Sequence, residues 1–134
     1  MEFWDIYDKD KKPTGRTMKK NDWILKDGEY HLSVLGVIHR PDGRFLITQR
    51  VMTKAWAPGC WEVSGGAAQA GEDSKDAVRR EVLEETGLKV EKTTYLFTLP
   101  NIYVYSGFPV HTLDMFFLCR VKDTSHIAAM DDAA

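Results

Sequence analysis

Residues 65–88 read GGAAQAGEDSKDAVRREVLEETGL, a glycine-rich loop followed by a helical pattern. Asp73 or Ser74 can cap the amino end of such a helix, and Gly87 occupies the position at which helices commonly end. The spacing therefore predicts a helix over residues 73–86, and the rest of the fold has to be built around it.

The remainder of the chain is rich in predicted strands. Apolar or alternating stretches indicate strands over residues 30–39, 44–50, 60–64, 90–99, 102–106 and 110–121. Residues 8–29 are polar and rich in turn formers, which favours a loop or a short hairpin. Gly65 and Gly66 are expected to interrupt regular structure. One helix among many strands indicates an α+β fold, in which a further element should cover the sheet face that the helix leaves open.

Length and composition limit the class of protein. The 134 residues suffice for one domain, 43% of them are hydrophobic, and the net charge is −2. This charge argues against nucleic acid or an anionic membrane as the main partner. The longest apolar run, Met115–Cys119, is far shorter than the ~20 residues of a membrane helix. The start of the chain lacks the order of a secretory signal. We therefore expect a single cytoplasmic domain over residues 1–134.

Three glutamates share one face of the predicted helix. At ~100° per residue, Glu84 lies about 60° to one side of Glu81, and Glu85 lies about 40° to the other. The apolar residues on or beside this arc are Ala77, Val78 and Val82. The residues expected on the opposite side are Arg79, Leu83 and Thr86. The acidic face should therefore adjoin the core.

A solvated acidic surface explains this arrangement poorly. Glu81 and Glu85 are like charges at i,i+4 spacing, which destabilises a helix by roughly 0.2–0.5 kcal/mol. Both lie near the carboxyl end of the helix, where the helix dipole disfavours anions. The obvious ion-pair partner is Arg80, at i−4 from Glu84. Crowded carboxylates either bind a proton or hold a cation, and oxygen ligands favour Mg²⁺ or Mn²⁺.

The loop before the helix suits phosphoryl chemistry. Gly65 and Gly66 let the backbone approach a ligand closely. Glu72 stands at the amino end of the helix, where the dipole favours an anion. A metal cluster between such a loop and the acidic helix would neutralise a diphosphate and lower the pKa of a water that attacks phosphorus.

Gly66, Glu72 and the run Arg80–Leu88 match the Nudix box, G-x5-E-x7-R-E-U-x-E-E-x-G-U, at every defined position. The order of strands around the box, with residues 61–66 directly before it, also resembles the α/β/α sandwich of the Nudix family and its mixed central sheet. The resemblance covers residues 30–121.

The resemblance implies a role for the charged residues of the box. Glu84 and Glu85 would be metal ligands, and Glu81 would be either a ligand or the base that activates water. Arg80 would orient these carboxylates as part of the catalytic set. The implied cofactor is Mg²⁺, with Mn²⁺ as the alternative, and the implied partner is a small-molecule diphosphate; a homodimer stays open.

The other box residues would support this centre. Glu72 would brace the loop–helix–loop unit, and the carbonyl of Gly65 would complete the metal site. Gly66 would border the substrate, and Gly87 would have a structural role at the end of the helix.

Many members of the family draw another acidic ligand from a loop near the far end of the domain. The candidates in this sequence are Asp114 and the pair Asp131 and Asp132. The family usually continues with another strand and a covering helix, which this sequence lacks. We therefore expect either a truncation at the C-terminus or a cover that comes from elsewhere.

Candidate substrate contacts also lie before the box. Arg50 and Lys54 follow a predicted strand and could hold substrate phosphates, against the alternative of a solvated strand end. Trp56 could stack on a base or pack at the rim of the site, and the residue type favours neither.

The first 60 residues resemble one branch of the family, the proteins similar to isopentenyl diphosphate isomerase. The stretches that carry this likeness are WDIYD (4–8), PTGR (13–16), LITQR (46–50) and KAWAPGCW (54–61). Three functions follow: a Mg²⁺-dependent hydrolase of a nucleoside diphosphate derivative, a prenyl diphosphate isomerase, or a non-catalytic nucleotide-binding module. The complete box disfavours the module. The absence of cysteine and histidine from residues 61–66 disfavours the isomerase.

Overall fold

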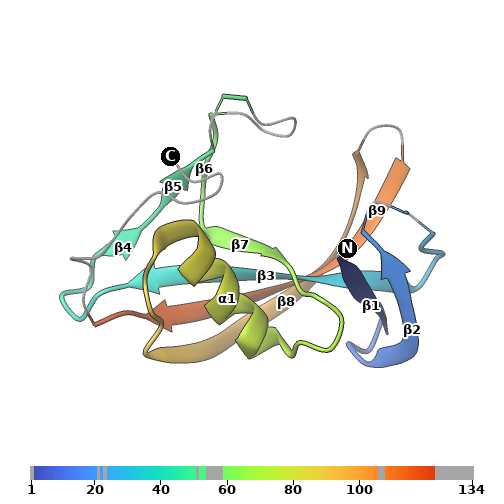
Figure 1. The fold of residues 1–134 in the computed structure, drawn as a ribbon, viewed down its shortest axis with the longest axis horizontal. Coiled ribbons are helices and arrows are strands. Elements are labelled where there is room, and N and C mark those ends of the chain that lie inside the picture. The colour runs from blue at the N-terminus through green and yellow to red at the C-terminus, as the bar shows by residue number, and fades with distance from the viewer. Residues whose placement is uncertain are drawn as a thin grey trace.

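The computed structural model describes residues 2–20, 22, 24–50, 52–53, 59–105 and 108–122 (Figure 1). Its strands are β1 (Phe3–Asp8), β2 (Pro13–Lys19), β3 (Glu29–His39), β4 (Phe45–Leu46), β5 (Thr48–Gln49), β6 (Trp61–Glu62), β7 (Ser64–Ala67), β8 (Lys92–Tyr105) and β9 (Phe108–Arg120). The helix α1 spans Ser74–Thr86, between β7 and β8. In these ranges no helix has the length and apolar content needed to cross a membrane.

Strand β3 is the centre of a mixed sheet. It pairs antiparallel with β1, β4 and β7 and parallel with β9, which in turn pairs antiparallel with β8. Because β2 pairs with β1, the main path across the sheet is β2–β1–β3–β9–β8. Strands β5 and β6 form a separate two-stranded ribbon. A mixed sheet with one helix confirms the predicted α+β class.

The helix has the boundaries that its capping residues predict. The side chain of Asp73 accepts a hydrogen bond from the backbone N–H of Asp76 at 2.7 Å, which satisfies one of the free amides of the first turn. Gly87 ends the helix with φ 75°, in the left-handed region that glycine adopts without strain. The predicted helix over residues 73–86 is therefore confirmed.

The helix rests directly on β3 because that strand carries a glycine beneath it. A Cβ placed on Gly36 would lie 3.0 Å from a methyl of Val82 and 3.1 Å from a methyl of Val78. Both valines are fully buried, and so is Phe117 of β9, in the same apolar cluster. Figure 1 shows α1 lying across the middle of the sheet. This close packing fixes the height of the acidic helix face above the strands.

Four local expectations are corrected by the structure. Gly65 and Gly66 do not interrupt regular structure, because both pair with β3 inside β7. Residues 44–50 form not one strand but two, since β4 pairs with β3 and β5 pairs with β6. In place of two predicted strands, Lys92–Tyr105 form one strand, β8, that runs through Pro100; proline is tolerated there because β8 is an edge strand. Thr86 does not point to solvent.

Thr86 is buried because its side chain forms hydrogen bonds with backbone groups at the end of the helix. Its hydroxyl donates to the carbonyl of Val82 at 2.7 Å and accepts from the backbone N–H of Leu88 at 3.2 Å. A threonine that satisfies two backbone groups in this way can lie in the core without an unpaired polar atom.

The polar N-terminal part forms the hairpin β1–β2 rather than a loop, and it packs against the loop before α1. Trp4, Ile6 and Met18 form a second buried cluster, against which Ala67 of β7 packs. The side chain of Asp5 accepts a hydrogen bond from the backbone N–H of Gly71 at 2.9 Å. The hairpin is therefore attached to the glycine-rich loop.

We expect Gly36→Ala to destabilise the protein, because a methyl group at this position has to displace Val78, Val82 or the helix itself. Overpacking of a filled core costs about 1–3 kcal/mol, so thermal or denaturant unfolding should show a clear loss. A variant as stable as the parent would mean that α1 does not rest on β3 at this distance.

Candidate functional site

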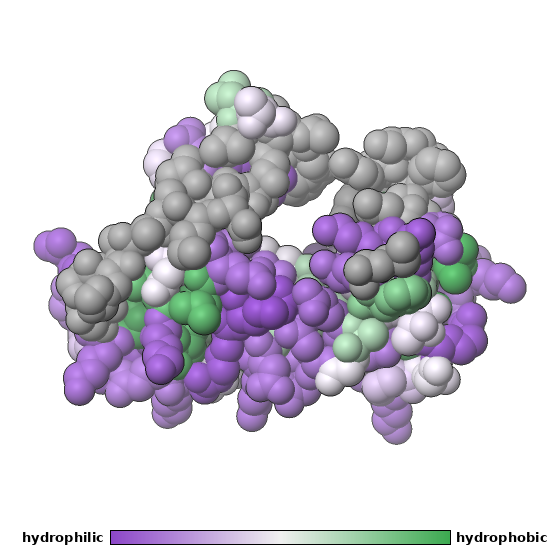
Figure 2. Space-filling model, in the orientation of Figure 1, coloured by the Kyte–Doolittle hydropathy of each residue, from purple (hydrophilic) through white to green (hydrophobic). Residues whose placement is uncertain are grey.

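The three glutamates of α1 differ in their exposure to solvent. The side chain of Glu81 is 14% exposed, whereas that of Glu84 is 45% exposed, and Glu85 is half-buried. Figure 2 shows hydrophilic surface over the middle of this face of the molecule. Glu81 is thus much more withdrawn from water than Glu84, and it lies on the side of the helix that faces the glycine strand β7.

The two glycines of β7 make room for these carboxylates. A Cβ on Gly66 would lie 2.7 Å from the carboxylate atoms of Glu81, so the absent side chain leaves the space that Glu81 occupies. The backbone N–H of Gly65 donates to Oε1 of Glu85 at 3.3 Å. Strand β7 therefore presents bare backbone to two of the three glutamates.

Arg80 links the helix to the loop that precedes it. Its Nε and Nη2 donate to the two carboxylate oxygens of Glu72 at 2.7 and 2.9 Å, a bidentate pair. Its Nη1 donates to Glu81 at 3.0 Å and to Glu84 at 3.2 Å. Nη2 also donates to the carbonyl of Ala67 in β7 at 3.2 Å. One guanidinium therefore connects strand, loop and helix.

These contacts shift the protonation of the groups involved. The bidentate hydrogen bonds that Arg80 donates to Glu72 lower the pKa of Glu72 and raise the pKa of Arg80, so both stay ionised. Burial raises the pKa of Glu81, against the opposing effect of Arg80, and the charges of Glu84 and Glu2 raise it further. Glu81 therefore accepts a proton more readily than an ordinary solvent-exposed glutamate.

The donor chemistry of the site fits a hard divalent cation. Carboxylate oxygens on one helix face meet a glycine strand with no side chains between them, and such oxygens are the ligands that Mg²⁺ and Mn²⁺ prefer. Within the described residues, no three His, Cys, Asp or Glu side chains converge closely enough to hold an ion as they stand. The guanidinium of Arg80 lies between the carboxylates of Glu72, Glu81 and Glu84.

The remaining predicted site residues are spread over the fold. Arg50 directly follows β5, where its guanidinium pairs with Glu62 at 3.5 Å. Asp114 lies in the middle of β9, in register with Ser33 of β3, and burial raises its pKa. The predicted residues outside the described ranges are Lys54, Trp56, Asp131 and Asp132.

Three residues beside the site were not predicted from the sequence. Gln69 belongs to the loop of the box, and Glu2 and Asp5 come close to this loop because β1 pairs with β3 alongside it. No spacing pattern points to them, since Glu2 and Gln69 are far apart along the chain. Only the pairing of the N-terminal hairpin could have indicated their place.

Comparisons with known proteins place the chain in a family. A model of the NUDIX domain matches residues 29–133. The chain belongs to the Nudix family.

Individual relatives and structures are similar over large parts of the chain. A Nudix hydrolase of Listeria monocytogenes is 36% identical over 92 residues, which are 68% of this chain and 54% of that protein. An isopentenyl-diphosphate Delta-isomerase of Kocuria rhizophila is 32% identical over 90 residues, 66% of this chain and 49% of that protein. The crystal structure of a MutT Nudix hydrolase from Burkholderia pseudomallei superposes with a TM-score of 0.65 at 26% identity, over 78% of each chain.

These matches confirm the family and the fold that the box predicts. The chain spans about half the length of the curated relatives named above. The isomerase-like branch predicted from the sequence is thus represented among the relatives.

Alanine at the two glycines of β7 should have different effects. In Gly65→Ala the new Cβ would lie 2.2 Å from the backbone oxygen of Val34, which cannot move without breaking the sheet. We expect a loss of at least about 1–3 kcal/mol in the free energy of unfolding. In Gly66→Ala the clash is with the flexible end of Glu81, so the stability should change little.

Denaturant unfolding of both variants checks this contrast. Equal losses of stability would show that Glu81 cannot move away from Gly66, and that its position is fixed by more than the open space above the strand.

Proposed function

We propose that this protein hydrolyses a diphosphate bond in a nucleoside diphosphate derivative, with Mg²⁺ as its cofactor. The observation that carries the proposal is the position of Glu81, half-buried against the bare backbone of Gly66 and held by Arg80. The complete box around it supports a reaction rather than binding alone. A module that only bound nucleotides would not need several crowded carboxylates.

The chain's own residues have separable roles in this reaction. Glu84 and Glu85, with the carbonyl of Gly65, would hold the cation, which when bound neutralises the diphosphate and lowers the pKa of a nearby water. Arg80 keeps Glu81 oriented and stays charged because of Glu72. As water attacks phosphorus and the anhydride P–O bond breaks, Glu81 accepts the proton of the water; its raised pKa suits this task.

A panel of diphosphate compounds tests the proposal. Nucleoside diphosphate sugars, dinucleoside polyphosphates and nucleoside triphosphates are incubated with the protein and Mg²⁺, and the products are identified by chromatography. We expect cleavage of at least one nucleoside diphosphate derivative, and no cleavage when a chelator removes the metal. Tight binding without turnover of any compound would instead support a nucleotide-binding module.

Isopentenyl diphosphate belongs in the same panel, because relatives of the isomerase type match this chain. That family's isomerases use a cysteine and further histidines after the tryptophan at position 61, and residues 62–66 contain neither. We expect no conversion to the dimethylallyl isomer. Detection of that isomer would replace hydrolysis by isomerisation as the function.

Glu85→Gln tests the metal role with the least change in structure. The amide oxygen of glutamine can still accept from the N–H of Gly65, but the negative charge is lost. We expect metal affinity and turnover to fall by about two orders of magnitude. Without metal the variant should melt no lower than the parent, because a repulsive i,i+4 pair with Glu81 is gone. With saturating Mg²⁺ the parent should be the more stable.

Glu91→Gln is the matched control, since Glu91 is exposed beyond the end of α1 and faces Arg120 at 3.9 Å. Calorimetric titration with Mn²⁺ and thermal unfolding with and without Mg²⁺ give the two readouts. If Glu85→Gln lost the same stability with and without metal, Glu85 would be a structural partner of the strand and not a ligand.

A further inference from the structure

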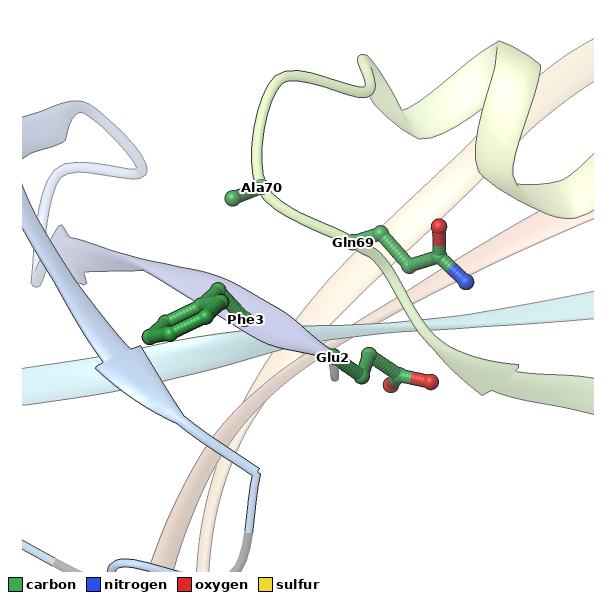
Figure 3. A pocket seen from close by; sticks show the side chains of 4 residues that line it. All are labelled: Glu2, Phe3, Gln69 and Ala70. Carbon is green, nitrogen blue, oxygen red and sulfur yellow. The ribbon is translucent and has the colours of Figure 1, made fainter.

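A pocket lies between the N-terminal strand and the loop of the box. It is lined by Glu2, Phe3, Gln69 and Ala70, and its volume is about 450 Å³, within the range of small-molecule sites. Figure 3 shows the side chains of Glu2 and Gln69 extending in the same direction, from β1 and from the loop, while Phe3 and Ala70 point to the other side of their segments. The pocket thus offers a carboxylate and a carboxamide together.

The two walls of this pocket are fixed to one another. The backbone N–H of Ala70 donates to the carbonyl of Phe3 at 2.7 Å. The carboxylate of Glu2 accepts from the indole N–H of Trp4 at 2.6 Å, and Trp4 is only 4% exposed and stacks on His31 at 4.2 Å. Glu2 is therefore a preorganised acceptor rather than a mobile surface side chain.

The pocket also retains hydrogen-bonding capacity. Oε2 of Glu2 accepts from Trp4, whereas Oε1 has Lys20 at 4.0 Å, beyond hydrogen-bond distance. Among the described residues, the side-chain amide of Gln69 has no hydrogen bond to another protein group, although its backbone N–H donates to Glu72 at 2.8 Å. A ligand could satisfy both groups.

The pocket adjoins the acidic site of α1. Gln69 is joined to Glu72, which holds Arg80, and the charge of Glu2 acts on Glu81. A diphosphate held at the helix could therefore extend into the pocket. Glu2 and Glu81 carry two negative charges against the single ammonium of Lys20, 4.0 Å from Glu2, so a further phosphate would be disfavoured there, whereas N–H and O–H donors or a cation would be favoured.

We propose that the pocket formed by Glu2 and Gln69 binds the non-phosphate group attached to the substrate's diphosphate, and that this group is neutral or cationic and carries N–H or O–H donors. The inference rests on the proposed function and narrows its substrate class. A sugar or an amino alcohol has this chemistry. The terminal phosphate of a nucleoside triphosphate does not.

Matched pairs of compounds test the inference. Each pair shares a nucleoside and its diphosphate and differs only beyond it: UDP-glucose against UTP, and CDP-ethanolamine against CTP. We expect kcat/KM of the parent to favour the first member of each pair by about tenfold or more. Glu2→Gln keeps the shape of the side chain and can still accept the hydrogen bond from Trp4. In this variant kcat/KM for the triphosphates should rise, and the ratio of kcat/KM within each pair should fall. In Gln69→Ala, KM for the first members should rise.

Asp10→Asn is the control, because it removes the same charge from the turn at the opposite end of β1 and should leave the preference unchanged. A parent that favours triphosphates, or a preference that Glu2→Gln leaves intact, would overturn the inference while the proposed function stands.

Binding of the same pairs to the parent and to Glu2→Gln is measured by calorimetry with a chelator present, so that no turnover takes place. If the parent cleaves none of the compounds, the proposed function fails and these dissociation constants decide the inference alone. The inference is supported if the first member of each pair binds about tenfold more tightly than the second and Glu2→Gln removes this difference. Equal dissociation constants within the pairs overturn the inference.

Discussion

The guanidinium of Arg80 is the contact on which the site depends. It makes hydrogen bonds to the strand before the loop, to the glutamate at the start of the helix, and to two glutamates further along it. A planar group with five donors can hold such a set in one geometry, which an ammonium group cannot. The carboxylates can crowd on one face because this cation offsets part of their mutual repulsion.

The glycines of β7 provide the space that the carboxylates held by Arg80 need. A side chain at Gly66 would collide with Glu81, and one at Gly65 would collide with the backbone of β3. The strand therefore brings bare peptide groups next to half-buried carboxylates. Burial raises the pKa of Glu81 in this setting, whereas the arginine lowers that of Glu72. Neighbouring glutamates of one motif thus acquire different chemistry from their surroundings.

The N-terminal hairpin forms one side of the pocket lined by Glu2 and Gln69, and this side lies outside the box. Its attachment to the loop through Asp5 and Phe3 sets the position of Glu2 beside Gln69. In the proposed reaction the box holds the diphosphate, so discrimination between substrates would come from such surrounding segments. The hairpin and the loop offer hydrogen-bond acceptors and negative charge at that place, which limits what can lie next to the diphosphate.

The sequence by itself determined the helix, its caps, the acidic face and the family, because these depend on spacing over a few turns and on residues adjacent in the chain. It could not show that Gly65 and Gly66 continue a strand, or that Thr86 turns inward, since both follow from partners elsewhere in the sheet and helix end. The contact of Arg80 with Ala67 and the approach of Glu2 to Gln69 likewise required the tertiary structure. Long-range strand pairing determines which side chains distant in the sequence come into contact, and the periodicity of residues along one segment does not reveal which strands pair.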